Sequence, residues 1–212
     1  MTATDQVSHR ERKRARTWTA IHLAAAHAAA THDHLSDITI EAIADAAYVS
    51  PRTFFNYFKS KEDAVLGLRA AVISDTVVDE FQIAPGDDLV EKVAFLLLTV
   101  FRTTNHKQIT QTEYADLMDR HPELARRRFR YIDDVQALVA EFVTERLVAS
   151  KGWTSAHPDE SAEEAAQMVV TVAGAVMRAA MRPILTRADL EGTDADAILR
   201  RKCTQFRNVT RP

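Results

Sequence analysis

The sequence predicts an all-α protein of about nine helices. Apolar residues recur mainly at helical spacing, no alternating strand pattern stands out, and the 212 residues include only five Gly and six Pro. With 46% apolar and 27% charged residues, the chain has the composition of a globular protein and is long enough to bury a core. Collagen, linker-type disorder and an all-β barrel are therefore excluded.

The first helix is predicted over about residues 11–31. Trp18, Ile21, Ala25 and Ala28 recur at helical spacing and form one apolar stripe along it. A polar loop follows this helix. The stripe is expected to pack against the short helices that come next in the chain.

A short helix is then predicted over about residues 40–47. Thr39 supplies an N-cap hydroxyl, and Glu41 places a negative charge on the first turn. Ile43 and Ala44 belong to its inward face. The helix is expected to last about two turns.

A second short helix is predicted over residues 51–58. Ser50 is its N-cap, and Pro51 occupies the first helical position, where proline is favoured. Phe54 and Phe58 lie four residues apart and are expected to face the core. The remaining side chains of this helix then point outward.

The rest of the chain is again predicted to be helical. Ser60 and Asp63 resemble a capping box that opens a helix running to about Phe81. Ser161 and Glu164 form a stronger capping box before a later helix. Further helices are expected at about residues 88–103, 108–119, 123–149, 162–185 and 194–207, with a loop at 152–158.

The charge is unevenly distributed, although the formal net charge is only -3. Residues 1–61 carry eight Lys and Arg against six Asp and Glu, whereas the remainder carries nineteen against twenty-four. Five of the basic residues fall within the seven positions from Arg10 to Arg16. Such a run is either a solvated arm or a segment that binds phosphates.

Two short helices joined by a tight turn match a DNA-binding helix-turn-helix. Among the outward residues of the second helix, Arg52 offers a bidentate donor for guanine and Asn56 a donor and acceptor pair for adenine. Thr53 and Phe55 can contact a thymine methyl group. Phosphate contacts are assigned to Thr39, Ser50, Tyr57 and Lys61. The full set of predicted DNA-binding residues is Thr39, Ser50, Pro51, Arg52, Thr53, Phe55, Asn56, Tyr57 and Lys61.

The run from Thr39 to Asp63 resembles the amino-terminal domain of TetR-type transcriptional regulators. It has the threonine-capped entry, the Val-Ser pair, the Thr-aromatic-aromatic and Tyr-Phe sequences, and Ser-Lys in register. The resemblance implies an all-helical homodimer with three amino-terminal helices that bind DNA. It also implies about six carboxy-terminal helices that enclose an inducer pocket, the last two pairing in a four-helix dimer interface.

Two departures from the family pattern concern loops. Tyr48 stands where the family usually has a glycine in the turn, so a conformation that suits glycine is expected to be strained or altered. Near the end of the first helix, alanines and a Thr-His-Asp-His run replace the usual large aromatic residue and glycine turn. Leu35 is expected to fill the lost aromatic volume.

The chain is predicted to divide into a DNA-binding domain at residues 1–63 and a ligand-binding and dimerisation domain at residues 64–212. The resemblance implies a pocket for an apolar or amphipathic inducer, and its candidate residues are Phe95, Phe101, Tyr114, Met118, Phe129 and Met168. The segment 162–185 is apolar on nearly every side and should be buried all round. The candidate dimer-interface residues are Val172, Ala173, Val176, Ala180, Ile198 and Phe206.

The sequence gives little support for an enzymatic, a metal-binding or a membrane-spanning function. Cys203 is the only cysteine, no catalytic motif occurs, and four early histidines lack metal-ligand spacing and are expected at the surface. A site formed by Glu113, Asp116 and His121 is disfavoured, and no cofactor is expected. The longest nearly uncharged apolar stretch of the later chain, 165–177, is too short to span a bilayer, and a cytoplasmic location is expected.

The sequence thus predicts a DNA-binding transcriptional regulator, in particular a repressor that a small-molecule inducer releases from a palindromic operator. The alternative is an all-helical protein-interaction module with a vestigial helix-turn-helix.

Overall fold

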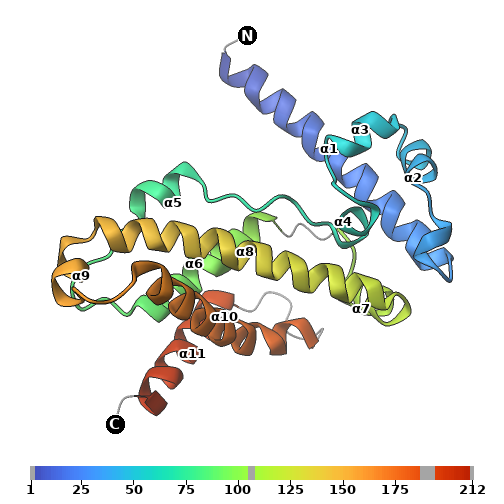
Figure 1. Ribbon diagram of the computed structural model, residues 1–212. Coiled ribbons are helices and arrows are strands. Elements are labelled where there is room, and N and C mark those ends of the chain that lie inside the picture. Colours follow the sequence, from blue (N-terminus) through green and yellow to red (C-terminus); the bar gives the residue numbers. More distant parts are fainter. Residues whose placement is uncertain (1–2, 105–107, 187–193, 211–212) are drawn as a thin grey trace. The chain divides into compact units, whose positions relative to one another are not determined.

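The computed structural model describes residues 3–104, 108–186 and 194–210, whose regular elements are helices (Figure 1). The chain divides into two compact units. Unit 1 consists of Met1–Ala70 and Asn105–Arg130, and unit 2 consists of Ala71–Thr104 and Tyr131–Pro212. The predicted boundary after residue 63 falls inside a helix, because α4 spans Lys61–Leu66.

Unit 1 is built around the long first helix. Its elements are α1 (Ala3–Thr31), the 3₁₀ helix η1 (Leu35–Asp37), α2 (Ile40–Ala46), α3 (Pro51–Phe55), α4 (Lys61–Leu66), α7 (Gln111–Arg120) and the first turns of α8 (Pro122–Ala149). α1 packs against α2, α4 and α7. Figure 1 shows its amino-terminal half extending past the short helices.

The core of unit 1 contains the predicted apolar stripe and the two predicted phenylalanines. Trp18, Ile21 and Ala25 are buried, as are Phe54 and Phe58. The ring centroid of Phe58 lies 5.5 Å from that of Trp18 and 5.9 Å from that of Phe54. Phe58, which follows α3, therefore connects Phe54 of α3 to Trp18 of α1.

Leu35 is buried as well, at the position where it was expected to replace a missing aromatic side chain. It begins η1, directly after the Thr-His-Asp-His run. A single leucine therefore closes the core at the end of α1.

The predicted helix over residues 60–81 ends much earlier than expected. α4 stops at Leu66, and Gly67 adopts a left-handed conformation with φ of 64°. The amide of Leu68 donates to the carbonyl of Asp63 at 2.9 Å, which completes a Schellman C-cap. The signal for this stop was the glycine itself, which is favoured immediately after a helix.

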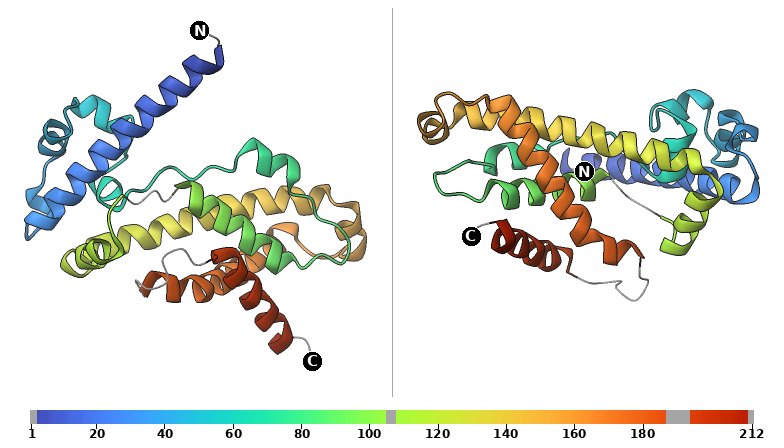
Figure 2. Two further views of the ribbon diagram at one scale, coloured as in Figure 1. Left: turned by 180° about the vertical axis from the view of Figure 1, so that it is seen from behind. Right: turned by 60° about the horizontal axis from the view of Figure 1, so that its bottom comes forward.

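Unit 2 contains the remaining helices. They are α5 (Asp75–Glu80), α6 (Leu89–Thr104), most of α8, α9 (Lys151–Ala156), α10 (Ala162–Thr186) and α11 (Ala195–Thr210). α10 packs against both α6 and α11, and α11 also packs against α6 (Figure 2). Ion pairs reinforce this arrangement, since Arg207 reaches Asp88 and Arg102 reaches Asp196, each at 3.0 Å.

The described residues contain eleven α-helices rather than about nine. α5 and α9 are the additions, because the sequence predicted a continuous helix over the first and a loop over the second. Each is short and has a serine N-cap, Ser74 for α5 and Ser150 for α9. Both helices are too short to show an apolar period in the sequence.

In the single chain, the described part of the segment 162–185 is not buried on every side, so its complete burial stays a prediction that depends on a second subunit. Ala173, Met177 and Ala180 face the interior of unit 2, whereas Met168 and Ala175 are exposed. α10 therefore has one buried face and one exposed face, on which Met168, Ala175 and Ala179 lie among polar residues such as Thr171 and Arg178.

Candidate nucleic-acid interface

The helix-turn-helix of unit 1 begins with the caps that the sequence predicted. The hydroxyl of Thr39 accepts a hydrogen bond from the amide of Ala42 at 3.1 Å. The hydroxyl of Ser50 accepts one from the amide of Thr53, also at 3.1 Å, and Pro51 is the first residue of α3. Each cap satisfies one backbone donor that a helix start leaves unpaired.

The turn between α2 and α3 contains a left-handed tyrosine. Tyr48 has φ of 56° and is the one non-glycine residue with positive φ in the described ranges. Its side chain is 97% exposed, so packing does not compensate for the conformation. The amide of Val49 donates to the carbonyl of Ala44 at 2.9 Å and holds the turn closed. The chain thus keeps the backbone shape that glycine favours, with a tyrosine in its place.

α3 presents the predicted reading side chains to the outside. Arg52, Phe55 and Asn56 are exposed, while Thr53 and Tyr57 are half-buried. The helix is shorter than predicted, because α3 ends at Phe55 and Asn56 is its C-cap. Asn56 nevertheless retains a right-handed helical conformation and continues the exposed surface of the helix.

Lys61 occupies a more structural position than the sequence predicted. Its Nζ atom donates to the carbonyl of Leu35 at 2.5 Å and to that of Ile38 at 2.9 Å. These two bonds attach the amino-terminal end of α4 to η1 and to the entry of α2. One of the three ammonium protons is left for a phosphate.

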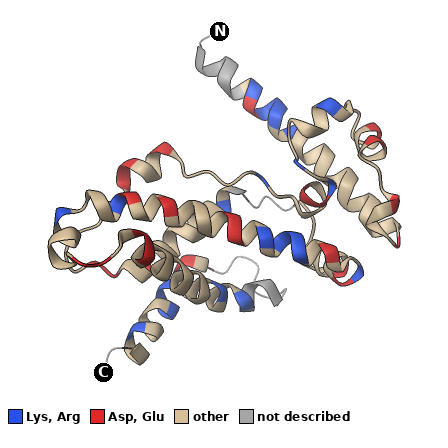
Figure 3. Ribbon diagram, in the orientation of Figure 1, with Lys and Arg blue, Asp and Glu red and all other residues tan. Residues whose placement is uncertain are grey.

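The basic run lies within α1 and not in a separate arm. Its five side chains are exposed, and Figure 3 shows the Lys and Arg positions on the amino-terminal half of this helix. Arg10 and Arg14 precede Trp18 by eight and four residues, so they lie on the face of α1 that carries Trp18. Arg12 and Arg16 point to other sides.

Two histidines are buried hydrogen-bonding groups of unit 1, which corrects the expectation of a surface position for His22. Its Nδ1 atom donates to the carbonyl of Ala64 at 2.7 Å, and its Nε2 atom accepts from the amide of Gln108 at 3.3 Å. Burial lowers the pKa of His22, against the opposing effect of the Ala64 hydrogen bond. His121 donates from Nε2 to the carbonyl of Ala29 at 2.7 Å. Within the described ranges, no three His, Cys, Asp or Glu residues are placed to hold a metal.

A buried ion pair joins α4 to the first turns of α8. Arg127 Nε lies 2.7 Å from Asp63 Oδ1, and the two side chains are 18% and 6% exposed. Burial raises the pKa of Asp63, although Arg127 acts in the opposite direction. The sequence analysis treated Asp63 only as a capping residue and did not identify this pair.

The candidate ligand residues are divided between the two units. Tyr114 and Met118 belong to unit 1, whereas Phe95, Phe101 and Met168 belong to unit 2. Phe129 and Met168 are exposed, at 67% and 66%. Several of the others have local partners: Arg128 donates to the hydroxyl of Tyr114, and the ring of Phe101 packs against that of Tyr131.

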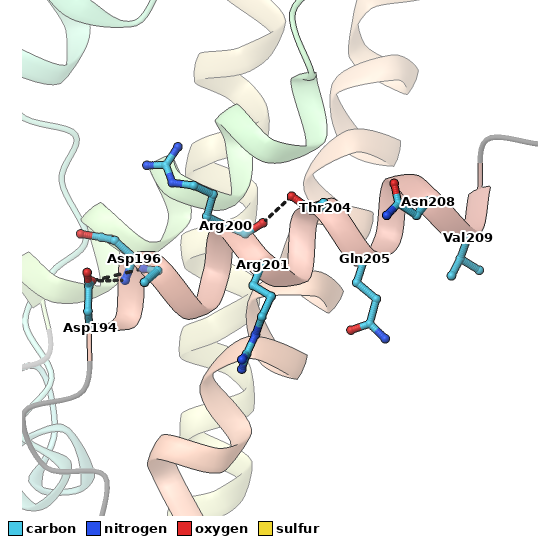
Figure 4. A pocket seen from close by; sticks show the side chains of 9 residues that line it. Asp194, Asp196, Arg200, Arg201, Thr204, Gln205, Asn208 and Val209 are labelled. Atoms are coloured by element: carbon cyan, nitrogen blue, oxygen red, sulfur yellow. Dashed lines mark hydrogen bonds between the residues drawn. The ribbon is translucent and has the colours of Figure 1, made fainter.

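Two hollows among the described residues of unit 2 are lined mainly by polar residues. One follows the outer side of α11, where Arg200, Arg201, Gln205 and Asn208 project from a single helix (Figure 4). Another lies between α8 and α10 and includes Glu141, Glu145 and Glu163 among its lining residues. Neither contains a candidate ligand residue.

Half of the candidate dimer residues are already covered in the single chain. Ala173, Val176 and Ala180 are buried inside unit 2, so their side chains are not available to a second subunit. Val172, Ile198 and Phe206 are half-buried. Apolar character alone did not reveal which face of α10 the neighbouring helices would take.

The capped entry, the closed turn and the exposed α3 define unit 1 as a helix-turn-helix DNA-binding unit. The family described as bacterial regulatory proteins, tetR family, matches residues 23–66, from the last third of α1 to the last residue of α4. The match confirms the predicted resemblance and supports a DNA-binding transcriptional regulator of the TetR type. No curated protein matches the chain. In the described ranges, no helix is long and apolar enough to cross a membrane.

Proposed function

We propose that the protein is a repressor that binds a palindromic operator as a homodimer and is released by a small-molecule inducer. The observation that carries this proposal is the exposed surface of α3, where Arg52 and Asn56 project from a helix that two buried phenylalanines anchor. A rigid helix with free base-reading side chains is what major-groove recognition requires. The protein would act in the cytoplasm, on operator DNA.

In this proposal the side chains around α3 divide their roles by chemistry. Arg52 donates to guanine and Asn56 pairs with adenine, while Thr53 and Phe55 contact a thymine methyl group. Ser50 and Tyr57 bind phosphates through their hydroxyl groups, and so does Thr39, whose hydroxyl accepts the capping bond but keeps its own proton to donate. Lys61 contributes through its remaining ammonium proton.

A two-fold dimer is proposed because a palindromic operator requires two recognition helices, about 34 to 36 Å apart. On the exposed side of α10, the apolar residues Met168, Ala175 and Ala179 lie among polar side chains, and this side is the proposed contact with a second copy. Ala175→Arg should therefore shift the sedimentation of the protein from dimer to monomer. Ala149→Arg, at an exposed position at the end of α8, is the matched control and should leave the dimer intact. A dimer that survives Ala175→Arg would place the interface elsewhere.

The inducer is proposed to act through unit 2 by favouring a different spacing of the two recognition helices. Coupling of this kind is typically about 1 to 3 kcal/mol and is reciprocal, so operator DNA should weaken inducer binding by the same factor. An apolar or amphipathic ligand is favoured because unit 2 contributes aromatic and methionine side chains that are not fully buried, including Phe95, Phe101 and Met168.

Selection of bound sequences from random duplexes tests DNA binding, palindromy and half-site spacing together. With the selected operator, Arg52→Ala should weaken binding by roughly 1 to 3 kcal/mol and relax the preference at one base position. Arg130→Ala, which removes an exposed charge from the same unit, should leave that preference unchanged. Failure of the wild-type protein to select any duplex at low salt would reject the proposal.

Salt dependence separates this function from the alternative of a protein-interaction module. Binding to DNA should weaken steeply as salt rises, because each neutralised phosphate releases counterions. A contact between apolar protein surfaces should strengthen or stay constant. A bound partner whose affinity is insensitive to salt would favour the alternative.

A further inference from the structure

One arginine of unit 1 lies over the ring of Trp18, and a second arginine lies close to the first. The guanidinium carbon of Arg69 lies 4.5 Å from the ring centroid of Trp18, in a cation–π arrangement. Arg14 lies one helical turn before Trp18 on the same face of α1. Burial and the charge of Arg14 both lower the pKa of Arg69, so the two cations are close enough to repel each other.

The position of Arg69 is fixed by the fold. The left-handed Gly67 ends α4, and buried Leu68 anchors the chain that follows, so Arg69 is directed onto α1. The platform below it is rigid, because Trp18 is 3% exposed and packs against Phe58. Arg69 is thus held in place before any ligand binds.

The two cations lack an anionic partner in the described part of the chain. No carboxylate forms an ion pair with Arg14 or Arg69 there, and the Nε atom of Arg69 is buried without a hydrogen-bond partner. A group with several anionic oxygens would balance the charge of the two guanidinium groups and remove the repulsion between the cations.

The location of the pair favours a phosphate of the DNA backbone as this anion. Trp18 contacts Phe58, which follows Asn56 by two residues at the end of the recognition segment. On its other side, the same face of α1 continues to Arg10. A duplex that receives α3 in its major groove has a backbone strand on the flank of that helix.

We propose that Arg69 and Arg14 together clamp one backbone phosphate of bound DNA beside the recognition helix. This inference rests on the proposed function and adds to it a phosphate site centred on Trp18. The site positions the duplex and is insensitive to its sequence.

The test is the salt dependence of affinity for the selected operator and for a random duplex of equal length. Arg69→Gln should weaken binding to both duplexes by the same factor, roughly threefold to tenfold at low salt, and should reduce the slope of log affinity against log salt by about one. Arg14→Gln should have the same effect, and its exposed position makes it the safer variant if Arg69→Gln folds poorly. The double variant should lose less than the product of the two single losses, because the residues share one phosphate.

Arg130→Gln is the control for a general loss of positive charge in unit 1, and it should leave the slope unchanged. If the wild-type protein binds both duplexes but Arg14→Gln leaves the slope of log affinity against log salt unchanged, the clamp is refuted while the proposed function is not. A loss confined to the operator would also overturn it, since a phosphate contact cannot distinguish sequences. If the wild-type protein binds no duplex at all, the proposed function and the clamp both fail.

Discussion

The strained turn of the helix-turn-helix gives a sharp test of the backbone geometry. Tyr48 is held at φ of 56° with its side chain 97% exposed. A left-handed conformation costs a residue other than glycine about 1 to 2 kcal/mol. Because the exposed ring contributes little packing, replacing it with glycine removes this cost and loses almost nothing in return.

Tyr48→Gly should therefore stabilise unit 1. The greater freedom of glycine in the unfolded chain offsets part of the gain, by roughly 0.5 to 1 kcal/mol. The net effect is a rise of about 1 kcal/mol in the free energy of unfolding, or roughly 2 to 4 °C in Tm for a chain of this size. At an m value of about 2 kcal/mol per molar, the urea midpoint should rise by roughly 0.5 M.

The assay can be confined to unit 1, because the chain contains two tryptophans, one in each unit. In a Trp153→Phe background, tryptophan fluorescence reports on Trp18 alone during urea unfolding. Tyr48→Ala is the matched control, since it removes the ring but keeps the Cβ atom that causes the strain. An equal rise in both variants, or no rise with glycine, would refute the assignment of strain to the left-handed backbone.

Three further predictions concern buried groups. Arg127→Gln leaves the Asp63 carboxylate without its cation and should destabilise unit 1 by about 3 kcal/mol. Burial raises the pKa of Asp63, so more of this carboxyl is protonated and uncharged at about pH 5 than at about pH 8. The urea midpoint should therefore fall more at about pH 8 than at about pH 5. Burial lowers the pKa of His22, so the folded chain binds this proton less readily than the unfolded chain, and stability should fall as the pH drops below the ordinary value of 6.5. His22→Gln should flatten that decline in the same titration. Burial raises the pKa of the Cys203 thiol to about 11, so a thiol reagent near neutral pH should label it only after unfolding, and rapid labelling of the native protein would contradict its burial.

The sequence was most informative where a local rule decides the structure. The caps at Thr39 and Ser50 and the buried pair Phe54 and Phe58 were predicted and confirmed, because each depends on residues within one turn of a helix. Gly67 is also a local signal, in this case for the end of a helix, yet the apolar spacing that continues beyond it favoured a longer helix. In the structure the left-handed conformation of Gly67 ends α4 despite that spacing.

Long-range contacts were not predictable in the same way. α7 belongs to the compact unit of the helix-turn-helix because Arg120 and His121 donate to the carbonyls of Ala30 and Ala29 at the end of α1. These partners are about ninety residues apart, and backbone carbonyls have no sequence signature. The phosphate clamp was missed for a related reason, since Arg69 lies beyond the recognised motif and only the fold places it over Trp18.

The apolar segment 162–185 shows a third kind of limit. Composition correctly indicated that much of α10 is buried, but it could not assign a given residue to α6, to α11 or to a second subunit. Small residues line both its buried face, at Ala173 and Ala180, and its open face, at Ala175 and Ala179. Tertiary packing alone decides between the two faces.

The buried pair between α4 and α8 also constrains how the signal of the proposed inducer could reach DNA. α8 begins in unit 1 and ends in unit 2, and its first turns are attached to α4 through Arg127 and Asp63. Breaking a buried pair costs about 3 to 5 kcal/mol, which exceeds the 1 to 3 kcal/mol that allosteric coupling typically supplies. A displacement of the first turns of α8 would therefore carry α4 with it rather than separate the two helices. Since Lys61 and Phe58 lie at the entry of α4, the recognition helix would move as part of the same rigid group.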